Sequence, residues 1–197
     1  MKKTLLTVAF LIVSLQAFAQ VKANLGIRAG INNARIDNAP FDHKTALYGG
    51  LFLALRLSDH YTLQPELIYS DQGGKARLGS TENIDINYIS ISLANKFFVG
   101  KNQGFHFILG PGLDFNFDDN LFDLINGKGE NLKITPVDLT ISGGVGYEFD
   151  FGLALELRYK QGLIDLDFKD KGEYGSDIEK NQLNSVVQIG LAYKFKM

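Results

Sequence analysis

The sequence contains no cysteine and only four prolines, and after residue 19 it has no apolar run long enough for a membrane helix. Such a helix needs about 20 mostly apolar residues, so a helical membrane protein is excluded. Without disulfides, a chain of this size requires a large core or closed backbone pairing for its stability. An excess of one charge is also missing. The 20 basic and 22 acidic residues give a net charge of -2, which leaves no broad basic surface for nucleic acid.

The N-terminus has the three parts of a secretory signal peptide. Met1-Lys2-Lys3 is a charged head, an apolar run from Leu5 to Leu15 follows, and Ala17-Phe18-Ala19 forms an A-x-A cleavage site. A membrane anchor is the alternative, but this run is too short to cross about 30 Å of hydrocarbon as a helix. We therefore predict a cleaved signal peptide over residues 1–19 and one domain over residues 20–197.

Apolar residues alternate with polar or small ones at period two, which is typical of strands with two different faces. The 21 glycines, 15 phenylalanines and eight tyrosines also favour strands joined by tight turns. Eight segments show the alternation: Asn24–Asn32, Ala46–Leu57, Tyr61–Ser70, Ile84–Val99, Gly104–Phe117, Ile134–Phe149, Gly152–Ile164 and Asn184–Phe195.

The connections alternate between long polar loops and tight turns. The long loops are Asn33–Thr45, Asp71–Asn83, Asp118–Lys133 and Asp165–Leu183, and the turns are Ser58–His60, Gly100–Gln103 and Asp150–Phe151. In an up-and-down meander every second connection lies at the same end, so all the long loops emerge at one rim. Outer-membrane barrels share this asymmetry. The sequence thus predicts an all-β, eight-stranded antiparallel up-and-down transmembrane β-barrel.

Alternation alone does not distinguish this barrel from a soluble lipocalin-type barrel, whose apolar face points inward. Three observations favour lipid on the outside. Glycines and charges of both signs share the polar face, and strands of nine or more residues match a tilted bilayer crossing. Aromatic rings, which suit membrane interfaces, crowd the strand ends. They are Tyr61, Phe97, Phe105, Tyr147, Phe149, Tyr193 and Phe195 at the turn side, and Tyr69, Tyr88, Phe115, Phe117 and Tyr159 at the loop side.

Closure of the sheet is expected because an unpaired backbone group is costly in hydrocarbon. Eight strands leave room only for side chains, so we predict a plugged barrel without an open pore. Buried charges require partners, and the polar face supplies both signs. We therefore predict a structural cluster of ion pairs, with a proton or solute path as the alternative. Its residues are Arg28, Arg56, Glu66, Glu148, Glu156 and Arg158.

Two segments depart from strict alternation. Ile84 and Ile86 share the parity of Tyr88, whereas the apolar residues that follow have the other parity, which predicts a bulge or a strand start near Tyr88. Gly110-Pro111-Gly112 interrupts the fifth segment, and a proline inside a strand predicts a bulge or local kink.

Three stretches resemble the PorT-like outer-membrane β-barrel family of Bacteroidetes-type bacteria. They are Leu25–Asn32, the hairpin from Leu55–Asp59 to Gln64–Ser70, and Gln188–Phe195. The resemblance spans nearly the whole mature chain, and its motifs encode barrel construction without shared chemistry. It implies an eight-stranded barrel in the outer membrane and leaves activity undefined.

No catalytic set, cofactor site or metal site is predicted. His43, His60 and His106 are dispersed by this topology, and a hydrolase or acyltransferase needs a base within reach of its nucleophile. Acidic clusters in two outer loops, around Asp118-Asp119-Asn120 with Asp123 and around Asp165, Asp167 and Asp170, offer oxygen ligands for Ca²⁺ or for bridging lipopolysaccharide phosphates. They match no complete calcium-loop pattern, so solvated loop charge is the preferred interpretation.

The leading hypothesis is a protein of the bacterial outer membrane that stabilises the envelope or presents its loops to a partner. The expected partners are outer-membrane lipid, lipopolysaccharide and an envelope protein, and no nucleic acid. The first alternative is a soluble periplasmic barrel that binds a small apolar ligand. The second is a membrane-barrel enzyme that modifies lipid.

Overall fold

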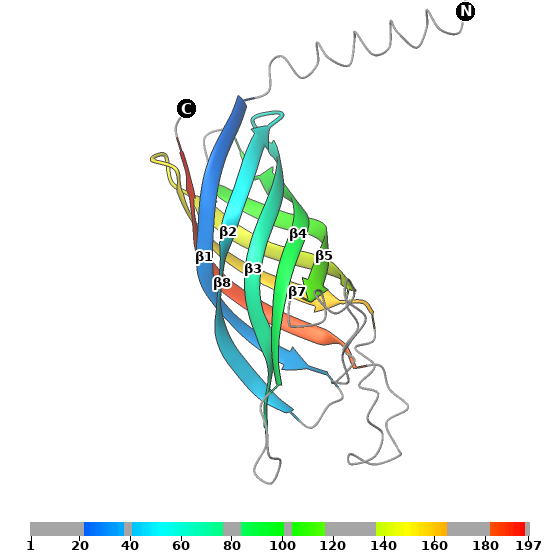
Figure 1. Cartoon of the computed structure of the whole chain (residues 1–197). Helices are drawn as coiled ribbons and strands as arrows, with labels where there is room; N and C mark the ends of the chain where they lie inside the picture. The colour runs from blue at the N-terminus through cyan, green and yellow to red at the C-terminus, as the bar shows by residue number, and fades with distance from the viewer. Residues whose placement is uncertain are drawn as a thin grey trace, which may run out of the picture.

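The computed structural model describes residues 22–37, 41–76, 84–100, 104–116, 137–164 and 182–195. Eight antiparallel strands form a closed barrel in which each strand pairs with the next and the last pairs with the first (Figure 1). They are β1 (Lys22–Ile36), β2 (Phe41–Arg56), β3 (Tyr61–Ala76), β4 (Ile84–Phe98), β5 (Phe105–Asn116), β6 (Val137–Glu148), β7 (Leu153–Gly162) and β8 (Asn184–Lys194). The predicted signal peptide and both acidic loop clusters lie outside the described residues. No helix in the described part is long and apolar enough to span a membrane.

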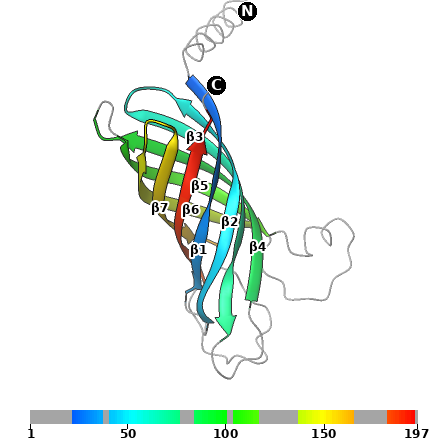
Figure 2. The same ribbon diagram turned by 90° about the vertical axis from the view of Figure 1, so that its left-hand side faces the viewer.

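The predicted eight-stranded barrel is confirmed, but the first three strands are longer than expected. The prediction made residues 33–45 a loop, whereas β1 continues to Ile36 and β2 begins at Phe41. Polar residues there still pair across the ladder, as Asn33 does with Thr45. The polar residues in this stretch indicate that the strands reach water; they do not mark the point where a strand ends. β1 to β4 therefore have 15 or 16 residues and β5 to β8 have 10 to 12. Figure 2 shows the longer strands reaching away from the end that holds the C-terminus.

The strands are staggered as well as paired. Partners followed from Arg28 through β2, β3, β4 and β5 lead to Asp138 in β6, whereas partners followed through β8 and β7 lead to Glu148 of the same strand. The two positions reached on β6, Asp138 and Glu148, are ten residues apart, and this offset is the stagger of the closed sheet. Such a stagger obliges the strands to tilt relative to the barrel axis. Residues that meet in the lumen therefore lie at unequal distances from their strand ends.

Apolar side chains cover the outside and charged ones lie inside. Leu109 and Leu155 are each 53% exposed, whereas Glu66 is 4% and Glu156 is 2% exposed. This arrangement is the reverse of a soluble ligand-binding barrel, so the lipocalin-type alternative is wrong. In hydrocarbon the outer face is solvated by lipid, and all strand edges are paired by closure.

The bulge predicted near Tyr88 is absent from the described pairs, because β3 and β4 keep one register from Tyr61↔Phe97 to Gly74↔Ile84. Ile86 and Tyr88 instead point inward and are completely buried. The inner face at this height mixes apolar side chains with polar ones such as Ser70 and Gln72, so the change of parity reflects inward apolar residues and not a bulge. Tyr88 is therefore not one of the outer aromatic residues. The other aromatic residues predicted at the rims lie on the outer face, apart from Phe117, which lies outside the described residues.

Pro111 also sits in β5 without a register shift, since the pairing with β6 runs unbroken from Phe105↔Tyr147 to Phe115↔Val137. On the β4 side, the bond from the Val99 amide to the Phe105 carbonyl fixes which alternate residues exchange hydrogen bonds. That alternation places Pro111 opposite Leu93, where proline has no N–H to donate. The Asn95 side-chain amide donates to the Leu93 carbonyl at 3.2 Å and to the Leu109 carbonyl at 3.0 Å. A side chain thus replaces the missing backbone donor.

Candidate functional site: ion pairs across the barrel lumen

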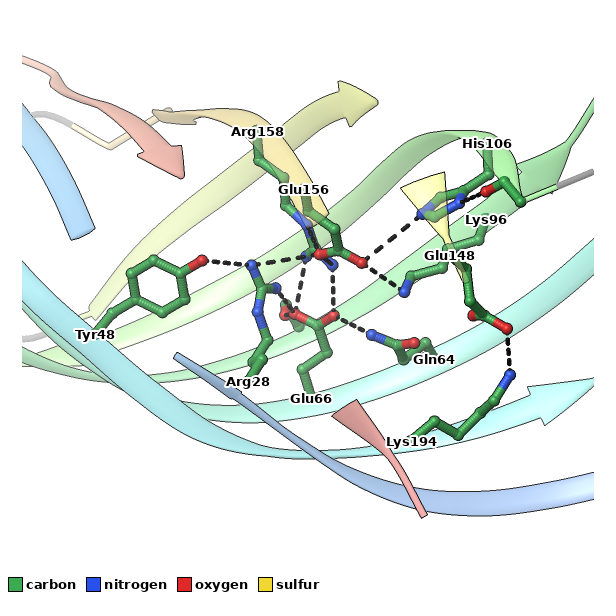
Figure 3. A network of polar contacts seen from close by, with 12 residues as sticks. Arg28, Tyr48, Gln64, Glu66, Lys96, His106, Glu148, Glu156, Arg158 and Lys194 are labelled. Atoms are coloured by element: carbon green, nitrogen blue, oxygen red, sulfur yellow. Dashed lines mark hydrogen bonds and ion pairs between the residues drawn. The ribbon is translucent and has the colours of Figure 1, made fainter. Parts of the chain in front are cut away.

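The middle of the lumen holds a set of directly bonded charged side chains, which we call the lumen network (Figure 3). Its members come from four strands and are Arg28 of β1, Glu66 of β3, Lys96 of β4, and Glu156 and Arg158 of β7. Each lies on the inward parity of its strand and is at most 4% exposed. The network connects strands that are not neighbours in the sheet, so it crosses the lumen.

Glu66 is the carboxylate that receives most donors. Arg158 donates two parallel hydrogen bonds to Glu66, both of 2.9 Å, and Arg28 donates a further one at 2.7 Å. Gln64 adds an amide donor at 2.7 Å and Ser92 a hydroxyl donor at 3.2 Å. Bidentate arginine pairs are among the strongest charge-assisted bonds because the guanidinium fork matches the carboxylate.

Glu156 is the second carboxylate of the lumen network, and it faces His106 on the turn side of the barrel. Arg158 bonds it through Nε at 3.0 Å and Nη2 at 2.7 Å, and the Lys96 ammonium lies 2.6 Å away. The Nε2 atom of His106 is 3.8 Å from Glu156, while its Nδ1 lies 2.8 Å from the Gly104 carbonyl. Because that carbonyl can only accept, Nδ1 carries a proton. His106 is completely buried, so its ring is closed off from lipid and from water.

Two glycines make room for the side chains around the network. A Cβ atom at Gly190 would lie 1.9 Å from the hydroxyl of Tyr48, which accepts a hydrogen bond from Arg28 at 3.1 Å. A Cβ atom at Gly146 would lie 2.6 Å from Nε2 of His106. A larger residue at either position would displace an aromatic ring that packs against the charged groups. The glycines of the polar face therefore provide space inside a narrow barrel.

The lumen network contains three cations and two carboxylates. Arg28, Lys96 and Arg158 supply the positive charges, and Glu66 and Glu156 the negative ones. The carboxylates are thus the scarcer partner, and Arg158 contacts both of them. Burying an unpaired charge is costly, so each carboxylate is needed to hold more than one cation.

The structure brings four of the six predicted charges together and leaves two apart. Arg56 lies at the turn-side rim, where it donates to the Asp59 carbonyl at 2.9 Å and stacks over the Phe98 ring at 5.0 Å. Glu148 pairs with Lys194 at the same rim. Both have the inward parity that led to their prediction. Parity gives the face of a strand, whereas the stagger of the barrel sets the height at which a side chain enters the lumen.

Sequence reasoning missed Lys96, although a signal was present. Ile91 and Leu93 lie on the outer face, and Lys96 has the opposite parity, which is that of the lumen. Its neighbour Phe97 was predicted as an aromatic residue of the turn-side rim, whereas Lys96 itself was not assigned to the lumen. Tyr48 was missed because a tyrosine among the residues of a predicted strand start suggests a membrane interface and not a lumen.

A second set of inward side chains lies toward the loop side and consists of neutral groups, which we call the loop-side layer. It is formed by Asn32, Ser70, Gln72, Asn184 and Gln188. Asn32 donates to Ser70 at 2.8 Å and accepts from Gln188 at 2.9 Å. Asn184 donates to Gln72, which joins β8 to β3 across the lumen. A separate ion pair links Lys160 to Asp114 at 2.5 Å.

Potential metal ligands do not gather within the described strands: no group of three or more histidine, cysteine, aspartate or glutamate residues there could hold a metal ion. The three histidines lie apart in that region. His43 contacts Asn33 on the outside at 2.7 Å, and His60 contacts the Phe98 carbonyl at 3.3 Å.

Comparisons with known proteins agree with this architecture. The family profile described as "Outer membrane protein beta-barrel domain" matches residues 18–167. Neisserial surface protein A superposes with a TM-score of 0.50 at 15% sequence identity, covering 88% of this chain and 97% of that one. Ail, the attachment invasion locus protein of Yersinia pestis, in complex with the heparin analogue sucrose octasulfate, gives a TM-score of 0.50 at 13% identity and covers 89% and 99%. At these identities the likeness concerns the fold alone. A comparison with curated proteins finds no match.

Proposed function

The chain belongs to the outer membrane protein β-barrel domain family, and on that premise we propose that it is a sealed scaffold whose loop side carries its role. It is an eight-stranded barrel of the bacterial outer membrane. The proposal has two parts. The lumen passes no solute, and the long connections at one rim stabilise the envelope or bind a partner there.

The lumen network carries the first part. Arg28, Glu66 and Arg158 are bonded to one another across the lumen and are at most 4% exposed. A hydrated solute would have to separate these pairs, and separating a buried pair is costly. An eight-stranded barrel has no room beside such side chains for a water column. We therefore interpret the cluster as structural and the proton or solute path as the weaker alternative.

The second part rests on the unequal connections. β5 ends at Asn116 and β6 begins at Val137, and β7 ends at Gly162 and β8 begins at Asn184, whereas the intervening turn needs only residues 149–152. Binding sites concentrate on loops held by a rigid scaffold. We propose lipopolysaccharide, outer-membrane lipid and an envelope protein as the partners at that rim.

Site-specific photo-crosslinking in intact cells tests the loop-side proposal. A crosslinker at residue 125 samples a long connection, and one at Ser58 samples a turn of the opposite rim as the matched control. We expect an adduct with lipopolysaccharide or an envelope protein from residue 125 and a different pattern from Ser58. The absence of any adduct at residue 125, or the same adduct from both sites, would contradict the proposal.

Conductance in planar bilayers tests the sealed lumen separately. We expect no stable channel from the wild type. The Glu66→Ala and Arg158→Ala double variant removes the densest ion pairs and serves as the positive control. A wild-type channel with open-state currents like those of the double variant would disprove the sealed scaffold.

We infer a PorT-like protein as the finer family assignment, on the motifs at Leu25–Asn32 and Gln188–Phe195. These motifs form the β1–β8 closure, where Ile27 pairs with Tyr193 and Ile31 with Ile189. If the assignment holds, the deletion strain should be complemented by a PorT-like barrel and not by an unrelated eight-stranded barrel of equal expression. Equal complementation by the PorT-like barrel and by the unrelated barrel would contradict the PorT-like assignment.

A lipid-modifying enzyme is the remaining alternative, and we infer that the chain has no such activity. His106 is the only histidine inside the described barrel, and it faces Glu156 and a backbone carbonyl. Lipid extracts from cells that express the wild type and His106→Ala should be identical by mass spectrometry. A product that requires His106 would establish the enzyme.

A further inference from the structure

Two long connections join the barrel at four positions on the lumen side, which we call the loop-base site. Asp114 lies near the end of β5 and Asp138 near the start of β6, so they flank one connection. Gly162 ends β7 and Asn184 begins β8, so they flank the other. Asp114 pairs directly with Asp138, and the β7–β8 register places Gly162 beside Asn184. All four positions belong to the described strands, unlike the acidic clusters predicted in the outer loops.

Asp114 and Asp138 are a buried pair of carboxylates accompanied by one lysine. Each aspartate is 1% exposed. Like charges directly opposite each other destabilise a sheet. Lys160 lies 2.5 Å from Asp114 and neutralises it, whereas no cation of the described strands forms an ion pair with Asp138. One negative charge therefore remains in this part of the lumen, and burying an unpaired charge is costly.

Only one carboxylate oxygen of Asp138 has hydrogen-bond donors. Oδ1 accepts from the backbone amides of Leu163 at 3.3 Å and Ile164 at 3.1 Å, which are the first residues after β7. Oδ2 is buried and has no hydrogen-bond partner in the described part of the chain. Asp138 thus holds the start of the β7–β8 connection with one oxygen and leaves the other oxygen available for a ligand.

Asn184 provides a second buried acceptor that lacks a donor. Its Nδ2 donates to Gln72 across the lumen, whereas its Oδ1 has no partner among the described residues. Gly162 contributes no side chain between β6 and β8. A Cβ atom there would lie 2.2 Å from Oδ2 of Asp138 and 3.3 Å from the carbonyl oxygen of Asn184. Asp138 and Asn184 are therefore inward neighbours across the glycine, with two orphaned acceptors and no donor for either.

We propose that the loop-base site binds one Ca²⁺ ion in the space beside Gly162. Asp138 and Asn184 offer a carboxylate, an amide and a carbonyl oxygen, and Ca²⁺ binds these three types in flexible geometry. Asp114 adds negative charge from the paired position of β5. A cation supplies what both orphaned acceptors lack, and it offsets the charge that Lys160 leaves unpaired. Amide and carbonyl oxygens complete a set that contains only two carboxylates.

The bound ion would join both ends of the β7–β8 connection. Asp138 already holds the backbone amides of Leu163 and Ile164 at its start, and Asn184 lies at its other end. Ca²⁺ therefore fixes the base of this connection and leaves the lumen network unchanged. The site goes beyond the proposed loop-side role, because it depends only on the barrel and not on any partner of the loops.

Isothermal titration of the purified barrel in nanodiscs of zwitterionic lipid, with Ca²⁺ as the titrant, tests this proposal. We expect the wild type to bind one ion through this site, and Asp138→Asn to bind it at least about tenfold more weakly, because ligand charge tunes Ca²⁺ affinity. Asn184→Asp replaces an amide ligand with a carboxylate and should bind about tenfold more tightly. Glu148→Gln is the matched control, since it alters an inward carboxylate of the opposite rim and should bind as the wild type does.

Three outcomes would overturn the proposal. The first is equal affinity of the wild type and Asp138→Asn, because the ion would then be held elsewhere. The second is unchanged or weaker binding by Asn184→Asp, which keeps the test decisive if Asp138→Asn does not fold. The third is no Ca²⁺ binding by the wild type together with an infrared band of a protonated carboxyl group that Asp138→Asn abolishes, since a proton would then satisfy the orphaned oxygens. No partner of the loops enters these measurements, so their failure is distinguishable from failure of the crosslinking test.

Discussion

The middle of the lumen and its loop-side end both bury polar side chains, but they satisfy them by different means. The lumen network uses ionised groups in which each carboxylate serves several cations. The loop-side layer uses amides and hydroxyls in single hydrogen bonds, such as that from Gln188 to Asn32. The difference implies that removing one group has unequal effects, because an orphaned ion is much more costly to bury than an orphaned amide.

The largest effect is expected from Glu156→Gln. This change leaves Lys96 without its carboxylate partner at 2.6 Å and weakens the hold on Arg158, so three cations share one anion. We expect the free energy of unfolding to fall by about 3–5 kcal/mol. Urea titration of the barrel refolded in vesicles, followed by the shift in gel mobility, measures it. Adding Lys96→Met should recover part of the loss, and a single variant as stable as wild type would refute the role of ionised pairs.

Arg28→Met should have a smaller effect although it also breaks an ion pair. Two cations and two carboxylates remain, and Glu66 keeps its two bonds from Arg158. We expect a loss of about 2 kcal/mol in the same titration. Arg56→Met is the control at the rim, where a half-buried charge without a carboxylate partner among the described residues contributes less than about 1 kcal/mol. If Arg28→Met lowers the free energy of unfolding as much as Glu156→Gln does, the excess of cations over carboxylates does not determine the stability of the lumen network.

Gln188→Met tests the loop-side layer. It removes one neutral hydrogen bond of 2.9 Å to Asn32, so we expect a loss of about 1 kcal/mol. The two layers share no hydrogen bond in the described part of the chain. The losses from Gln188→Met and Glu156→Gln should therefore add to within about 0.5 kcal/mol in the double variant. Strong coupling between them would show that the lumen is one continuous network.

The smallest effect is expected on the outer face. Asn95→Leu removes the donor to the Leu93 carbonyl opposite Pro111, but it gains apolar contact with lipid. We expect a net loss below about 1 kcal/mol. Pro111→Val restores a backbone N–H at that pair, so the loss from Asn95→Leu should shrink in the Pro111→Val background. An equal loss in both backgrounds would mean that Asn95 does not replace the missing donor.

The sequence predicted the number of strands and the inward faces of residues such as Glu66 and Glu156, because both follow from period-two alternation. It did not predict that Tyr88 points inward, since alternation was interpreted as if the lumen were polar along its whole length. The ends of β1 and β2 were misplaced because polar residues continue the ladder beyond the apolar belt.

The composition of the site was only partly predictable for a related reason. Arg56 and Glu148 share the inward parity of Glu66, yet they enter the lumen at another height. That height depends on the ten-residue stagger, which is a property of the closed sheet and is not encoded in any one strand. The pairing of β2 with β3 also contains a bulge between His43 and Tyr48, which the sequence did not predict. Residues 44–47 carry no glycine or proline that would mark an extra residue.

The lumen network also constrains how the barrel assembles. Its charges come from the first, third, fourth and seventh strands, so an incomplete sheet presents arginine and glutamate side chains that have not yet met. Charged groups left against acyl chains are strongly disfavoured. We therefore expect partly formed sheets to be disfavoured in the bilayer until the β1–β8 seam closes and the interior charges meet. The same contacts that seal the centre should thus favour insertion of the complete barrel over insertion of a partial sheet.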